Sequence, residues 1–556
     1  MRFPKITRFL TGVAVPVSSL RSQSSCGIGE FPDLVLFGEW CRRTGMDLIQ
    51  ILPVNDTGFD PSPYNARSAF ALNPVYLRLE DVPGWEICAD NILAARRRYE
   101  SSETLQYRNV LQFKLETLER IFRHNRAAIA ADKALQEWMQ ANPWLKTYSE
   151  YCGRSKELFH GWTQYHLELQ LKSAALQLHA MGIALKGDIP ILLSAQSADV
   201  NFNPSLFNTK LRVGAPPDMF SKEGQNWKFP SFRWEEMERD NYAWWRSRLE
   251  RASRFFNACR IDHVLGFFRV WVIPESVASA AHGYFEPANR IPAKALLQDF
   301  ELEVHELEKL VHSKTLLRTE GGYAPSWYWH HSSELMQLND RSGGRLRKRI
   351  HEYWDGQESP WRDHGRKVLG ALAESTDMLL CGEDLGVIPS CVPEVLEDLD
   401  ILGLRVERWS DRDGRLCSPE TYPRLTVSTT STHDSSTLRC WWQEHGWNRH
   451  EYFHALNLPG NCPDYLTTEV CAAIMERQLN SNSLIVVLPL QDLFALHYDL
   501  RTMDPHAERI NVPGVESDEN WVYRMKLPIE ALLAYDSYNN YVKRFIDHRR
   551  TKTLQD

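Results

Sequence analysis

The sequence has 556 residues, of which 43% are hydrophobic and 24% are charged, a composition typical of globular proteins. Its formal net charge of −8 argues against nucleic acid or an anionic membrane surface as a partner, because both are bound through basic patches. No stretch approaches the roughly 20 apolar residues that a membrane-spanning helix needs. The 11 cysteines include no C-x-x-C pair, which favours reduced thiols and a cytoplasmic location.

Short apolar segments alternate with longer helical patterns in the first half of the chain. Residues 9–17 follow three basic residues and superficially resemble a signal peptide. Gly12 and Pro16 interrupt this run and no clear cleavage site follows, which favours a first strand instead. Further strands are predicted over 47–54 and 183–193, and an extended segment over 69–79.

Two regions of the sequence are predicted to be insertions. From about residue 86 to 181, apolar residues recur at helical spacing, which predicts an inserted helical subdomain. Residues 275–370 are polar with helical patches, and we interpret them as a second insertion of uncertain structure. Residues 213–227 are predicted to be a long loop that carries Trp227 at its end.

The second half of the chain continues the alternation of strands and helices. Helix-like residues 242–257 precede the first of the predicted strands, which cover residues 258–264, 377–386, 404–409, 425–434 and 483–490. Such alternation gives parallel strands with right-handed crossovers. The predicted fold class is therefore α/β, a (β/α)8 TIM barrel with inserted, largely helical subdomains, forming a single catalytic domain over residues 1–556.

Three acidic residues, Asp262, Glu383 and Asp434, follow short apolar or β-branched strands. A parallel barrel brings the carboxyl ends of its strands to one rim, where active sites are built. Paired carboxylates suit glycoside chemistry: one ionised group attacks the anomeric carbon and one protonated group gives its proton to the leaving oxygen. Arg260 lies two residues before Asp262, on the same strand face, and is expected to keep Asp262 ionised and oriented.

Beyond the acids, short motifs run in a fixed order along nearly the whole chain. They are Gly27-Ile-Gly29, Ser62-Pro-Tyr64, Gly187-Asp-Ile-Pro190, Gly214-Ala-Pro-Pro-Asp218, Gly224-Gln-Asn-Trp227, Arg260-Ile-Asp-His263, Gly382-Glu-Asp-Leu-Gly386, Thr432-His-Asp434, Arg509-Ile-Asn-Val-Pro-Gly514 and Asn520-Trp521. In this combination the chain resembles the 4-α-glucanotransferases, also called amylomaltases or disproportionating enzymes, of glycoside hydrolase family 77.

The resemblance implies a retaining double displacement. Asp262 would be the nucleophile that forms a covalent glucosyl-enzyme, Glu383 the acid/base, and Asp434 the third acid, which binds hydroxyls of the distorted sugar. The resemblance also implies substrate-binding roles for Ser62, Tyr64, Asp188, Asp218, Trp227, Arg260, His433 and Asn511. From the residues alone, Tyr64 also reads as a turn residue and Trp227 as a packed loop anchor.

The implied substrates are α-1,4-glucans, with maltose or maltodextrins as donors and glucose, maltodextrins or glycogen as acceptors. No metal or other cofactor is expected, because no zinc-protease His pair, phosphate-binding loop or nucleophile elbow is found. Two alternatives stay open: an α-glucan hydrolase on the same site and, with less support, a non-catalytic glucan-binding protein. The sequence gives no clear indication of an oligomeric state.

One detail of the resemblance bears on the donor. The segments Gln225-Asn-Trp-Lys-Phe-Pro230 and Ser390-Cys-Val-Pro393 are closer to the branch that contains the plant cytosolic disproportionating enzyme, which uses maltose as donor. The starch-binding modules of that branch are not expected here, because the predicted barrel begins almost at Met1. The preferred donor is therefore left open.

Overall fold

The computed structural model describes residues 3, 6–153, 156–217, 221–299, 302–338, 340–408, 416–444 and 446–551. Its centre is an eight-stranded sheet in the order β11-β6-β3-β2-β1-β14-β13-β12, in which all paired neighbours are parallel. The strands are β1 (Leu10–Ala14), β2 (Leu48–Gln50), β3 (Ala184–Ile189), β6 (Ala258–Ile261), β11 (Leu379–Gly382), β12 (Gly403–Val406), β13 (Thr426–Thr429) and β14 (Ile485–Pro489).

The two edge strands of this sheet meet and close it into a barrel. A parallel bridge joins Cys381 to Leu402, and the Gly382 amide donates to the Leu402 carbonyl at 2.7 Å. This near-closure leaves little unpaired edge, and barrels avoid edge-to-edge association by closing in this way. The predicted (β/α)8 barrel is confirmed, and residues 10–14 form its first strand, as the interrupted apolar run at the N-terminus indicated.

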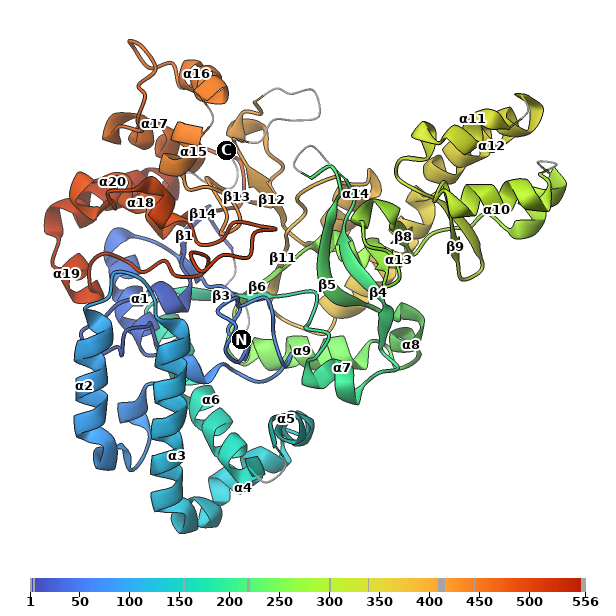
Figure 1. Ribbon diagram of the computed structural model, residues 1–556. Coiled ribbons are helices and arrows are strands. Elements are labelled where there is room, and N and C mark those ends of the chain that lie inside the picture. Colours follow the sequence, from blue (N-terminus) through green and yellow to red (C-terminus); the bar gives the residue numbers. More distant parts are fainter. Residues whose placement is uncertain are drawn as a thin grey trace.

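Helices that connect successive strands cover the outside of the barrel (Figure 1). They include α1 (Asp33–Thr44), α6 (Glu157–Ala180), α9 (Ala243–Ser253), α13 (Glu358–Ala373), α14 (Cys391–Asp398), α17 (Thr468–Leu479) and α20 (Asp536–Arg550). In α1, the side chains of Leu34, Phe37 and Trp40 are buried at helical spacing. Gly45 ends this helix in the left-handed conformation, with φ of 82°, and so turns the chain into β2.

Four helices between β2 and β3 extend from one side of the barrel (Figure 1): α2 (Ala89–Glu100), α3 (Tyr107–Ala131), α4 (Lys133–Gln140) and α5 (Trp144–Gly153). The prediction of a strand or extended segment over 69–79 is wrong. It contributes one bridge, from Leu72 to Asn55, and then turns into a 3-10 helix at Pro74–Tyr76. Pro74 has no amide to give to a strand ladder, and the Asn73 side chain caps the turn.

A four-stranded antiparallel sheet lies beside the barrel, in the order β5-β4-β7-β8. Its strands are β4 (Phe207–Ala215), β5 (Gln225–Phe232), β7 (Val270–Pro274) and β8 (Tyr284–Glu286). The long loop predicted over 213–227 is therefore wrong at both ends, and Trp227 lies on a strand. The glycines and prolines of this region indicated a turn, whereas the strand state depends on pairing of β4 with the distant β7.

The segment between β8 and α13 forms a second extension, which projects from the side of the barrel opposite α2 to α5 (Figure 1). It contains α10 (Val304–His312), the antiparallel pair β9 (Leu316–Thr319) and β10 (Gly322–Pro325), α11 (Ser333–Gln337) and α12 (Asp340–Asp355). Helix α13 then returns to the barrel and packs against α14. Across the ranges that the model describes, no helix has the length and apolar character to span a membrane.

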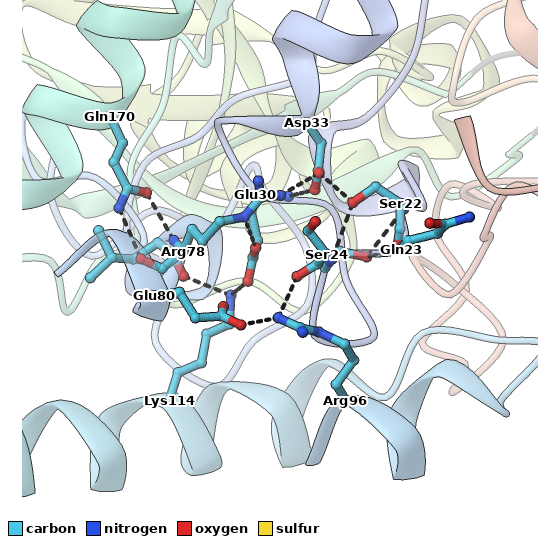
Figure 2. A network of polar contacts seen from close by, with 12 residues as sticks. Ser22, Gln23, Ser24, Glu30, Asp33, Arg78, Glu80, Arg96, Lys114 and Gln170 are labelled. Atoms are coloured by element: carbon cyan, nitrogen blue, oxygen red, sulfur yellow. Dashed lines mark hydrogen bonds and ion pairs between the residues drawn. The ribbon is translucent and has the colours of Figure 1, made fainter. Parts of the chain in front are cut away.

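A buried polar network attaches the helical extension to the loop between β1 and α1 (Figure 2). The ammonium of Lys114, on α3, lies 2.6 Å from Glu30 Oε1 and donates to the carbonyls of Val75 and Leu77 at 2.6 and 2.9 Å. Glu30 also accepts from Arg78 Nε at 2.8 Å. Lys114 is 0% exposed, so each of its protons needs the partner that it has here.

We predict that Lys114→Met destabilises the protein by about 3 to 5 kcal/mol, because it leaves Glu30 Oε1 and two buried carbonyls without the donor that Lys114 supplies. The midpoint of urea denaturation, followed by far-ultraviolet circular dichroism, measures the effect. Lys172→Met, at an exposed position of α6, is the matched control and should change stability by less than about 0.5 kcal/mol. Equal midpoints for the two variants would contradict the assigned role of Lys114.

Candidate active site

Two of the predicted catalytic acids extend from neighbouring strands of the barrel. Asp262 directly follows β6 and Glu383 directly follows β11, which pairs with β6. The ladder continues through both residues, since the Asp262 amide donates to Ile189 at 3.1 Å and the Glu383 amide to Ile261 at 2.9 Å. Asp434 lies in the turn that follows β13. The strand-end positions expected for Asp262 and Glu383 are thus found.

The guanidinium of Arg260 lies against three carboxylates. Its Nη1 donates to both oxygens of Asp188 at 2.9 and 2.8 Å and to Asp262 Oδ1 at 2.9 Å. Its Nη2 lies 3.8 Å from Glu383 Oε2. Arg260 and Asp188 are register partners on β6 and β3, so the barrel itself sets this contact. The Arg260 side chain is 9% exposed, and in such a buried site its positive charge offsets the charge of the acids around it.

The carboxyl group of Glu383 is prepared to hold a proton near neutral pH. Burial raises the pKa of Glu383 to about 7, and the charge of Asp262 raises it further while Arg260 opposes the shift. Two amides orient the group: His263 donates to Oε2 at 3.0 Å and Leu385 to Oε1 at 2.9 Å. A carboxyl group with such a pKa is suited to general acid and base catalysis.

Asp434 is held in the opposite protonation state. Desolvation by the protein around this partly exposed side chain would raise its pKa, but the neighbouring His433 imidazole and the Asn511 side-chain amide lower the pKa of Asp434 to about 2. His433 Nε2 lies 3.1 Å from Oδ2, and Asn511 Nδ2 donates to Oδ1 at 2.6 Å. The backbone amide of Asn511 donates to the backbone carbonyl of His433 at 3.1 Å. Asp434 is therefore a carboxylate, and it can accept hydrogen bonds of the kind that sugar hydroxyls donate.

Three rings gather beside these acids. The Tyr64 hydroxyl donates to Asp188 Oδ2 at 2.7 Å, and its ring stacks on His433 with centroids 4.9 Å apart and planes 13° apart. The ring of Trp521 lies 5.9 Å from Tyr64 and 6.1 Å from His433. Trp521 was not among the predicted site residues, although the motif Asn520-Trp521 was the signal that could have found it.

Trp227 borders the same region from the antiparallel sheet. Its ring meets the His263 ring edge-on, with centroids 5.1 Å apart and planes 87° apart, and its Nε1 donates to Gln225 Oε1 at 3.0 Å. Burial lowers the pKa of His263 to about 4, so this ring is neutral at pH 7. The half-buried indole thus packs on the residue next to Asp262.

Two further residues, Ser62 and Asp218, were predicted to bind substrate. Ser62 lies two residues before Tyr64 in the same loop, where its amide donates to Asp60 Oδ1 at 2.9 Å. Tyr64 contacts the acids, whereas Ser62 is half-buried within the loop. Asp218 lies outside the described residues.

A cavity of about 60 Å³ opens among these groups, with Arg260, Glu383 and His433 in its wall. Deeper in the barrel it is lined by Lys186 and Gln50, whose side chains are joined by a hydrogen bond of 2.8 Å. A carboxylate pair, a third acid and aromatic faces beside such a cavity are the equipment of an enzyme acting on glycosidic bonds.

Comparison with known proteins agrees with this geometry. Residues 15–158 and 154–529 match the model of the family described as 4-alpha-glucanotransferase. The chain belongs to this family. It is 32% identical to the 4-alpha-glucanotransferase DPE2 of Oryza sativa subsp. japonica, over 94% of this chain and 67% of that protein. It is 31% identical to the 4-alpha-glucanotransferase of Chlamydia trachomatis serovar D, over 96% and 94% of the two chains.

Solved structures of amylomaltases share the fold of this 4-alpha-glucanotransferase. The amylomaltase from Streptococcus agalactiae, solved in complex with acarbose, superimposes with a TM-score of 0.71 at 18% identity and covers 98% of this chain. The amylomaltase from Corynebacterium glutamicum gives a TM-score of 0.71 at 19% identity, over 97% of this chain and 75% of that one. The family places 4-alpha-glucanotransferase activity on this chain, and neither the hydrolase nor the non-catalytic alternative is favoured.

We predict that the rate of glucan transfer falls as the pH rises through about 7, since the raised pKa of Glu383 means that the required proton is lost there. The pH dependence of kcat/KM with maltotriose as substrate measures this limb, because kcat/KM reports the pKa values of the free enzyme. The folded protein must be shown to persist over the same range by circular dichroism. A rate that stays level or increases from below to above this pH would contradict the assignment of Glu383 as the proton donor.

Proposed function

We propose that the chain transfers an α-1,4-glucosyl or glucan segment from maltose or a maltodextrin to the 4-hydroxyl of glucose, a maltodextrin or glycogen, by a retaining double displacement. The observation that carries the proposal is the pair formed by Asp262 and Glu383. They extend from adjacent strands to a single guanidinium, and burial raises the pKa of Glu383 to about 7. An ionised nucleophile beside a protonated acid is what the first displacement requires.

In the first displacement, Asp262 attacks the anomeric carbon of the donor sugar. The bond between that carbon and the glycosidic oxygen breaks, and Glu383 gives its proton to the oxygen, so that the reducing-side fragment leaves as an alcohol. The sugar is then covalently bound to Asp262. Arg260, whose Nη1 donates to Asp262 Oδ1 at 2.9 Å, orients the attacking carboxylate.

In the second displacement, the 4-hydroxyl of the acceptor replaces the departed fragment. Glu383, now a carboxylate, takes the hydroxyl proton while the oxygen attacks the anomeric carbon. The bond to Asp262 breaks, which restores both carboxyl groups to their starting states. Two inversions at one carbon retain the α configuration.

Asp434 and the rings beside it are proposed to hold the sugar that reacts. Asp434 is ionised and its side chain is 46% exposed, so it is accessible to hydroxyls. Tyr64 presents a flat face on the same side, fixed by its hydroxyl on Asp188 and by its stacking on His433. His433, Asn511 and Arg260 then position the acids, whereas we leave Ser62 and Asp218 as proposed contacts on the family resemblance alone.

Transfer exceeds hydrolysis only if water is kept from the covalent intermediate. Trp227 closes one side of the site, because its ring packs on His263 next to the nucleophile. On the neighbouring residue of β5, Lys228 Nζ lies 3.1 Å from Glu516 Oε1 in the loop that carries Asn511. This pair is exposed and contributes little to stability, but it shows that β5 and this loop meet. An acceptor chain held beneath them would exclude water from the intermediate.

The proposed partners and location follow from the same chemistry. The acarbose bound by the S. agalactiae amylomaltase supports an oligosaccharide chain as the occupant of the cleft. All 11 cysteines are free thiols, which supports a reducing compartment, and we propose the cytoplasm.

Replacing Asp262 by Asn should reduce transfer by several orders of magnitude, because an amide does not attack the anomeric carbon. Initial rates of glucose release from maltotriose measure the effect. Asp363→Asn, at an exposed position of α13, is the control and should leave the rate unchanged. An Asp262→Asn variant with near wild-type rates would exclude Asp262 as the nucleophile.

Incubation with maltotriose should yield free glucose together with maltodextrins longer than the substrate, because the covalent glycosyl unit passes to another sugar. Chromatography of chain lengths over time follows both products, and addition of glycogen tests it as an acceptor. Reducing ends that increase steadily without any longer product would favour the hydrolase and contradict the proposed transfer.

A further inference from the structure

A second group of ligating side chains lies outside the catalytic site. It combines Cys440 and Glu444 of α15 (Leu438–Glu444) with His506 of the 3-10 helix Pro505–Glu508. Cys440 Sγ lies 3.1 Å from Glu444 Oε1 and 3.3 Å from His506 Nδ1, and these last two atoms are 3.8 Å apart. In the described ranges, this is the one group of three such residues whose ligand atoms all lie within 4.8 Å of one another.

Local structure brings the three side chains together. Cys440 and Glu444 are four residues apart on a helix, so their side chains lie on one face. The Asp504 side chain accepts from the His506 amide at 2.9 Å and so fixes the 3-10 helix. The Cys440 thiol is buried, whereas the His506 side chain is 58% exposed. The group is therefore rigid on its inner side and open to solvent on its outer side.

The dimensions and chemistry of this group suit zinc. Bond lengths of about 2.0 to 2.3 Å and tetrahedral angles place the ligand atoms of a zinc site about 3.3 to 3.6 Å apart, close to the observed separations. Three protein ligands with an open fourth position are a common zinc arrangement. Thiolate and imidazole ligands favour zinc over magnesium or calcium, which prefer oxygen. A thiolate and a carboxylate together balance the charge of a divalent ion.

The group is also connected to the catalytic acids. Arg509 Nη1 donates to Glu444 Oε1 at 3.3 Å and to Ser436 Oγ at 3.0 Å. Its Nη2 donates to the Asn511 carbonyl at 3.4 Å, and the Asn511 side chain holds Asp434. A cation on Glu444 Oε1 would take one acceptor from Arg509 and repel its guanidinium. The contacts of Arg509 with Ser436 and Asn511 would then weaken.

We propose that Cys440, Glu444 and His506 bind one Zn²⁺ ion, and that the bound ion lowers glucan transfer by disturbing Arg509 and, through Asn511, the position of Asp434. On binding, the S–H bond of Cys440 breaks, its proton leaves to solvent and a sulfur–zinc bond forms. The effect on transfer rests on the proposed role of Asp434, whereas the binding of the ion does not.

Cobalt titration of the full-length, chelator-treated protein tests the site, because a thiolate bound to Co²⁺ gives a charge-transfer absorption in the near ultraviolet. We expect this absorption to saturate at one Co²⁺ per chain and to disappear when Zn²⁺ is added. It should be absent in Cys440→Ser and His506→Ala and present in the control Cys462→Ser, at a half-buried thiol outside the group. His506 is exposed at the surface, so its variant is expected to fold, and circular dichroism checks this.

Absence of the absorption in the wild-type protein would overturn the site, as would its persistence in both variants. The effect on activity is measured separately, as the rate of transfer with and without Zn²⁺. We expect a several-fold loss in the wild-type protein, reversed by chelator, and no loss in His506→Ala. Zinc that binds without changing the wild-type rate would overturn the connection to Asp434. A chain inactive in every condition would contradict the proposed function, while the cobalt titration would still decide the site.

Discussion

The buried guanidinium of Arg260 is the contact on which the catalytic arrangement depends. It lies within hydrogen-bonding distance of Asp188 and Asp262 and within 3.8 Å of Glu383, at a point where three acidic side chains converge. Buried charges are tolerated only when they are paired and hydrogen-bonded. The barrel supplies the pairing, because β3, β6 and β11 are neighbours and bring one residue each to the same rim. The order of the strands therefore determines which acids share the charge of Arg260.

Neighbours, and not residue type, separate the acids into different roles. Glu383 and Asp434 are both carboxyl groups near the cavity, yet the pKa of one is raised to about 7 and that of the other is lowered to about 2. Glu383 is buried beside the acid Asp262 and accepts hydrogen bonds from two backbone amides. Asp434 has an imidazole and an amide side chain against its oxygens. A small change of partner would therefore exchange a proton donor for a hydroxyl acceptor without any change of the acid itself.

How far the sequence predicts this structure depends on the range of the interactions. The barrel strands and the acids that follow them were predictable, because burial and helix spacing leave local patterns in the chain. The antiparallel sheet was not, since β4 is a strand paired on one side with β5 and on the other with β7, which lies far along the chain. Trp227 was accordingly placed on a loop. Trp521 was missed as a site residue because only the folded chain brings its ring to Tyr64. The protonation states likewise depend on contacts between distant segments.

The strand order of the antiparallel sheet has a consequence for how the chain is organised. Strands β4 and β5 precede β6, which carries the proposed nucleophile Asp262, and β7 and β8 follow it. The strands of the antiparallel sheet therefore flank β6 on both sides in sequence, so one continuous segment of the chain encodes this sheet and Asp262. The extension between β8 and α13 lies beyond this enclosed unit. A change in the length of this extension would therefore leave the chain from β4 to β8, and with it the catalytic rim, uninterrupted.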